Sequence, residues 1–121
     1  MSIPAEEGFE RSRRLRADRQ RHLFTICDNV DLRFKPVCRL CDFWLLYQRD
    51  VNFRAYVFFK SAADIEVYKA SGLVDEIESF VYSELERYGR GKKSEITVAF
   101  EYDSDERVQR DYGGDYFARI R

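Results

Sequence analysis

The sequence predicts an α+β protein with a roughly four-stranded, mostly antiparallel sheet and helices packed on it. Residues 73–88 carry apolar side chains at helical spacing, whereas residues 43–59 and 95–102 hold strand-like runs rich in aromatic and β-branched residues. The last apolar run, residues 116–120, alternates as a strand does, so we expect it to be the final strand. The expected order of elements is α-β-β-α-α-β-α-β.

The first expected element is a helix over residues 5–30, with apolar side chains recurring near one face. These side chains are Leu15, His22, Leu23, Ile26 and Val30. Arginines surround its first half, at Arg11, Arg13, Arg14, Arg16, Arg19 and Arg21. We therefore expect about the first 10–20 residues to project or fray. Pro36 should end this region, because the residue before a proline is pushed out of the helical conformation.

The centre of the chain has the pattern of a hairpin followed by a short helix. Residues 43–47 and 53–59 are the two expected strands, separated by turn-forming residues. Apolar side chains lie on both sides of the second strand, which is typical of a central strand covered on both faces, at least at one end. Ser61 and Asp64 have the spacing of a capping box for a helix that Gly72 ends.

The strongest helix pattern covers residues 73–88, where one wide stripe is apolar and the opposite face is acidic. The stripe consists of Leu73, Val74, Ile77, Phe80, Val81, Leu85 and Tyr88. A further short helix is expected after the strand 95–102. Asp103 or Ser104 would cap it, and it would end near Tyr112.

Composition indicates one compact domain over residues 1–121, with 45% hydrophobic and 36% charged residues. No apolar run approaches the roughly 18 residues that span a bilayer, and the start of the chain lacks the apolar core of a secretory signal. Three cysteines form an odd set, which favours free thiols in a reducing cytoplasm. The net charge of −1 combines a basic first half with an acidic second half, an asymmetry that suits contact with one charged partner.

Four soft metal ligands occur in the first third of the chain: His22, Cys27, Cys38 and Cys41. A structural zinc site needs four such ligands, usually in two well-spaced pairs. His22 and Cys27 are five residues apart on the expected helix, so their side chains point in different directions. We therefore interpret Cys38 and Cys41 as small apolar residues that lead into the first strand, and we expect no metal and no other cofactor. Zinc remains the alternative.

Carboxylates cluster near the end of the strand 95–102. They are Glu101, Asp103, Asp105, Glu106, Asp111 and Asp115. Such groups bind Mg²⁺, so a metal-dependent nuclease is one interpretation, and a capped helix with a solvated acidic face is another. A third is that the acidic patch of Asp103, Asp105, Glu106, Asp111 and Asp115 binds a basic surface on a partner protein.

Two stretches resemble small bacterial immunity proteins that accompany polymorphic or contact-dependent toxins. One runs from Ala55 through Phe59 to Ile65, and the other from Phe100 through Ser104 and Gly114 to Arg119. The resemblance implies tight stoichiometric binding and neutralisation of one cognate toxin domain, often a nuclease, in the cytoplasm.

These observations favour a protein-binding inhibitor that is not an enzyme, with toxin immunity as its most specific form. The first alternative is a nucleic-acid-associated regulator that uses the Arg-rich first helix, although the acidic remainder of the chain argues against nucleic acid. The second alternative is a carboxylate-based, metal-dependent enzyme.

Overall fold

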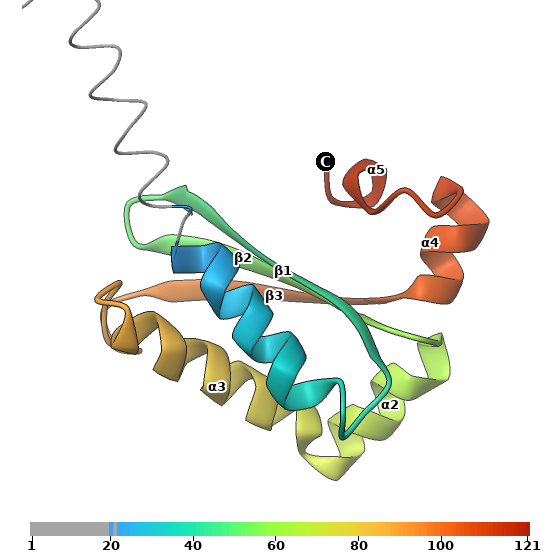
Figure 1. Cartoon of the computed structure of the whole chain (residues 1–121), viewed down its shortest axis with the longest axis horizontal. Helices are drawn as coiled ribbons and strands as arrows, with labels where there is room; N and C mark the ends of the chain where they lie inside the picture. The colour runs from blue at the N-terminus through green and yellow to red at the C-terminus, as the bar shows by residue number, and fades with distance from the viewer. Residues whose placement is uncertain (1–19, 21) are drawn as a thin grey trace, which may run out of the picture.

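A three-stranded sheet forms the centre of the molecule (Figure 1). The computed structural model describes residue 20 and residues 22–121. The strands are β1 (Leu40–Arg49), β2 (Asn52–Phe59) and β3 (Thr97–Ser104), in the spatial order β1-β2-β3. The central strand is therefore β2, which agrees with the apolar residues on both of its sides.

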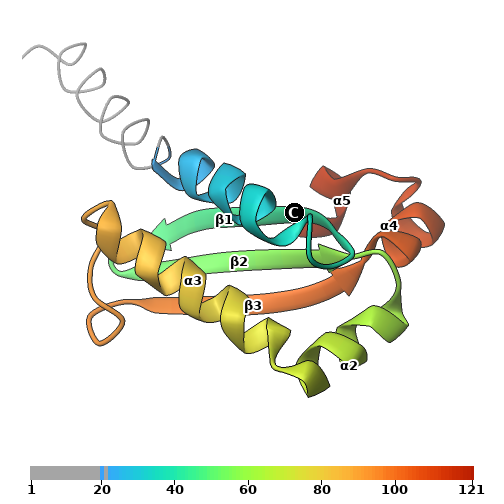
Figure 2. The same cartoon turned by 60° about the horizontal axis from the view of Figure 1, so that its bottom comes forward.

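Helices lie on both faces of this sheet, so the α+β class is confirmed. The N-terminal helix, described over residues 22–34, and α3 (Leu73–Arg87) cover one face (Figure 2). The short helix α2 (Ala62–Ser71) connects β2 to α3. On the other face lie α4 (Asp105–Tyr112) and α5 (Tyr116–Ile120), both at the end of the sheet where β2 and β3 finish.

The sheet is mixed, and the expectation of a mostly antiparallel sheet was wrong in this respect. β1 and β2 form an antiparallel hairpin, whereas β2 and β3 are parallel, in register from Asn52↔Thr97 to Phe59↔Ser104. The reason is the connection between them. Together α2 and α3 carry the chain from the end of β2 back to its beginning (Figure 2), so β3 must run in the same direction as β2.

The expected fourth strand is the helix α5. Asp115 caps it, because its carboxylate accepts a hydrogen bond from the backbone N–H of Ala118. Tyr116 and Ile120 are four residues apart, and both pack on the aromatic face of β2, where the Tyr116 ring meets Phe58 at 4.8 Å between centroids. In a five-residue run, apolar residues at the first and last positions fit both the two-residue repeat of a strand and the four-residue spacing of a helix. Periodicity alone therefore could not distinguish a strand from a helix here.

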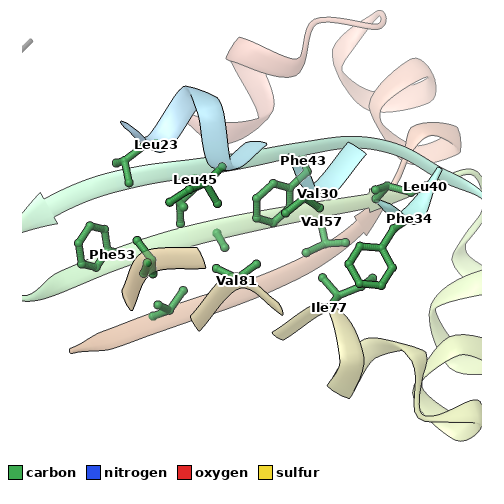
Figure 3. Packing of buried hydrophobic residues seen from close by; sticks show 14 of the residues in the cluster. Leu23, Val30, Phe34, Leu40, Phe43, Leu45, Phe53, Val57, Ile77 and Val81 are labelled. Carbon is green, nitrogen blue, oxygen red and sulfur yellow. The ribbon is translucent and has the colours of Figure 1, made fainter. Parts of the chain in front are cut away.

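The main core lies between one face of the sheet and the pair formed by the N-terminal helix and α3. Figure 3 shows Val57, Ile77 and Val81 pointing into this layer. The apolar stripe of α3 is confirmed, since Val74, Ile77, Val81 and Leu85 are buried and the other three members are partly buried against the same cluster.

A second, smaller core covers the opposite face of β2, but only toward the end of the strand. Tyr56 and Phe58 are buried there with Val108 of α4. Partly buried side chains complete it: Trp44, Leu46, Tyr112, Tyr116 and Ile120. The expectation that β2 is covered on both faces at one end is thus confirmed. None of the described helices combines the length and apolar character needed to cross a bilayer.

We expect Ile77→Asp or Val81→Asp to abolish cooperative folding. Both side chains are fully buried, and an unpaired buried charge costs more than the few kcal/mol by which a small domain is stable. Thermal melting followed by circular dichroism measures this. Ser79→Asp on the exposed side of the same helix is the control, with an unchanged melting temperature. A soluble Ile77→Asp protein that melts like the unsubstituted protein would contradict the packing of α3.

Candidate protein-binding surfaces

The acidic patch expected from the sequence gathers at one end of the sheet, around α4 and α5. Asp103, near the end of β3, is only 6% exposed. Its Oδ2 accepts hydrogen bonds from Arg119 Nε at 2.5 Å and from Arg107 Nη1 at 3.2 Å. Its Oδ1 accepts one from the backbone N–H of Ser104 at 2.8 Å. This carboxylate is therefore an internal anchor that ties α5 to the sheet.

Asp105 and Asp115 also serve the fold. Asp105 lies in the first turn of α4, where a negative charge is stabilised by the helix dipole. Its Oδ1 accepts hydrogen bonds from Tyr116 Oη at 2.5 Å and from Gln109 Nε2 at 3.2 Å. Burial of Tyr116 and its bond to Asp105 raise the pKa of the phenol above its ordinary value. Asp115 is the cap of α5.

The remaining two carboxylates are exposed. Asp111 accepts hydrogen bonds from Arg110 Nε at 3.0 Å and from Arg107 Nε at 3.4 Å, and these bonds lower the pKa of its carboxyl group. Glu106 has no side-chain hydrogen bond or ion pair with any other described residue. The structure thus brings the five candidates together, but it uses four of them in internal contacts.

The three thiols are free and half-buried. Burial raises the pKa of Cys27 to about 12, although the backbone of Leu45 hydrogen-bonds its sulfur. Cys38 donates a hydrogen bond to the carbonyl of Phe34 at 3.1 Å, as a small helix-end residue does. Among residues 20 and 22–121, no three His, Cys, Asp or Glu side chains are grouped so that they could hold a metal ion.

Sequence reasoning missed one surface, the part of the sheet that α4 and α5 leave uncovered. Tyr56 and Phe58 are buried on this face, whereas Arg54, two residues earlier on the same side of β2, is exposed. A depression of about 340 Å³ lies beside it. We call the residues that line it the open half of the sheet: Gln48, Arg49, Asn52, Phe53, Arg54, Thr97 and Ala99.

The open half of the sheet is electropositive. It contains two arginines and no carboxylate. The nearest acidic side chain along β3, that of Glu101, points its carboxylate at Arg119 of α5, with 3.4 Å between Oε1 and Nη2. One signal in the sequence could have revealed this surface. Arg54 is a lone charged residue on the side of an expected central strand whose next two positions are aromatic.

A second depression, of about 430 Å³, lies between the N-terminal helix and α3. It is lined by Arg33 of the N-terminal helix and by Asp75, Glu76 and Phe80 of α3, and the Arg33 guanidinium lies 5.2 Å from the centroid of the Phe80 ring. Its lining mixes both signs of charge, so it indicates no particular partner.

Six arginines expected on the first helix, Arg11 to Arg21, lie outside the described residues, and their role stays a prediction. Comparisons with known protein families, with curated proteins and with solved structures find no match for this chain.

We expect Asp103→Asn to lower the free energy of unfolding by about 3 kcal/mol, because it leaves the Arg119 guanidinium, 13% exposed, without its buried counter-charge. Urea denaturation measures this. Glu101→Gln removes the other carboxylate that Arg119 contacts, but its side chain is 47% exposed, so the cost should stay below about 1 kcal/mol. Equal effects of the two substitutions would contradict the anchoring role of Asp103.

Cys27 should be the slowest of the three thiols to react with iodoacetamide. With a pKa of about 12, roughly one Cys27 thiol in 10,000 is ionised near pH 8, and the thiolate is the reactive form. Mass spectrometry of partly labelled folded protein gives the order of reaction. Protein unfolded in guanidinium chloride is the control, in which the three thiols should react alike. Equal labelling of Cys27 and Cys41 in the folded state would show that Cys27 is accessible.

Proposed function

We propose that this protein is a protein-binding inhibitor and, most specifically, an immunity protein that neutralises one bacterial toxin domain by stoichiometric binding in the cytoplasm. The observation that carries this proposal is the half-covered sheet. Its central strand is buried on both faces at one end and presents Arg54 to solvent at the other. In this proposal the chain is not an enzyme and needs no cofactor, because its work is done by a surface.

The rigidity of this surface favours a protein partner. β2 is hydrogen-bonded on both sides, to β1 and to β3, and its opposite face is packed against the main core. The backbone of such a strand loses little freedom when a partner docks, and pre-organisation of this kind lowers the cost of binding.

The exposed side of the acidic patch is the proposed contact for a basic region of the toxin domain. Glu106 and the outer edge of Asp111 are available for it, whereas Asp103, Asp105 and Asp115 hold α4 and α5 in place. Exposed charges of this kind steer a partner of opposite sign and mainly raise the association rate. One partner can contact both regions, because they lie at the two ends of the same short sheet.

The proposal is tested by co-expressing this chain with each toxin-like gene encoded beside its own gene. We expect one of these genes to stop bacterial growth alone and to be tolerated together with this chain. The purified pair should bind with 1:1 stoichiometry in isothermal titration calorimetry. If no neighbouring product is neutralised or bound, the immunity proposal is wrong.

Within that complex, Glu106→Lys should slow association about fivefold at low salt and much less at high salt, because the steering charge is reversed. Stopped-flow mixing measures this rate. Glu66→Lys on α2 is the matched control, since it changes the net charge equally on an exposed residue outside the acidic patch. If both variants associate at the rate of the unsubstituted protein, the acidic patch is not part of the contact.

A further inference from the structure

We infer that the open half of the sheet is an acceptor site for acidic side chains of the protein partner, with Arg49 and Arg54 as the carboxylate-binding groups. This inference rests on the proposed function, because it names the partner chemistry that a protein-binding surface at this place would select. The partner would then make two contacts of opposite sign, with a basic group near Glu106 and an acidic group at Arg49 and Arg54.

The position of Arg54 is the first reason. It stands on the central strand, flanked in register by Leu46 of β1 and Ala99 of β3. The side chain of Ala99 is only a methyl group and does not cover Arg54, whose side chain is exposed. An uncovered sheet face ordinarily carries polar and charged side chains, which remain available to a partner. Arg54 is presented from the central strand, which is hydrogen-bonded on both sides.

The second reason is the geometry of the guanidinium. Arg54 Nη1 donates a hydrogen bond to Tyr56 Oη at 3.5 Å, and Tyr56 is itself held under α5. A guanidinium offers five N–H donors in a fixed plane and binds a carboxylate through two parallel hydrogen bonds. One nitrogen is thus directed by Tyr56, and the other donors form no hydrogen bond with any side chain that the structure describes.

The lining of the depression supplies the remaining polar groups. Gln48 and Asn52 carry amides, Thr97 carries a hydroxyl and Arg49 carries a second guanidinium. Among the described residues, no carboxylate lines this surface. The loop before β3 also contains the exposed residues Lys92 and Lys93, of which Lys93 lies 5.3 Å from the ring centroid of Tyr82 on α3. Glu95 in that loop is bonded to the backbone N–H of Lys92.

Protein carboxylates fit this surface better than a nucleic acid strand does. Single-stranded nucleic acid is held by exposed aromatic rings on which bases stack, together with a groove of positive charge. Within the described part of the chain, Phe53 is the one aromatic residue that lines the open half, and its side chain is buried in the main core. The chain as a whole carries a net charge of −1, which disfavours a polyphosphate strand running across the molecule. A few carboxylates on a protein surface meet the two arginines without that repulsion.

The inference can be tested without knowing the partner. The probe is a blocked peptide of about ten residues that carries two Glu residues among Gly and Ser, titrated into ¹⁵N-labelled full-length protein and followed by NMR. We expect saturable shifts of the backbone amides of residues 48–54 and 97–99. The double variant Arg49→Gln and Arg54→Gln should weaken this binding at least fivefold, because the paired hydrogen bonds are lost.

A matched control removes two positive charges elsewhere. Lys35→Gln with Lys60→Gln gives the same change in net charge at exposed residues away from the depression, and it should leave peptide binding within about twofold. Both double variants should keep the melting temperature of the unsubstituted protein. If the peptide shifts other residues, or if both double variants weaken it equally, the acceptor site is wrong.

A ten-nucleotide oligo(dT) is titrated in the same way. Tighter binding of the oligonucleotide than of the peptide at residues 48–54 would overturn the assignment to protein carboxylates. The outcome is separable from that of the co-expression test. Neutralisation of a toxin without peptide binding would overturn this inference alone, whereas peptide binding at the open half without any neutralised toxin would support the inference and remove the immunity proposal.

Discussion

The two-sided burial of β2 is the constraint on which the rest of this structure depends. Phe59 and Val57 on one side of the strand and Phe58 on the other are fully buried, and each such side chain contributes about 1.5–3 kcal/mol when it leaves water. The N-terminal helix and α3 cover one side of the strand and together bury a continuous apolar layer. The other side requires its own cover, and the C-terminal segment supplies it. The two cores and the position of α5 follow from this requirement.

The cover on the second face is short, and polar contacts hold it in place. Five residues of α5 bury little apolar area, so the helix is tied to β3 by the pair between Arg119 and Asp103. Breaking a buried pair of this kind is far more costly than breaking an exposed one, because one charge is left without its partner. The same shortness of α5 leaves the first half of the face without cover. The open half of the sheet, with Arg54 at its centre, is the part of this face that α4 and α5 do not cover.

The acidic patch shows why charge patterns need a structure before they are assigned a role. The crowding of carboxylates is visible in the sequence, and so is the spacing of four residues that places Arg107 next to Asp103 and Asp111. The contact of Asp103 with Arg119, sixteen residues away, is not visible, because it depends on the turn that folds α5 back over the sheet. These contacts mean that part of the acidic patch holds the C-terminal helices α4 and α5 in place. Glu106 is left as its freely exposed member.

The sequence by itself determined the elements whose signals are local. The stripe of α3, the capping box of Ser61 with Asp64, the Ser104 cap of α4 and the double-sided pattern of β2 are all present in the structure. Tertiary structure decided three further features: the direction of β3, the helical state of Tyr116–Ile120 and the exposure of Arg54. The physical reason is the same in each case. A strand pairs in the direction that its connection allows, a five-residue apolar run fits two periods, and a side chain on a sheet is exposed or buried only according to what the rest of the chain places over it.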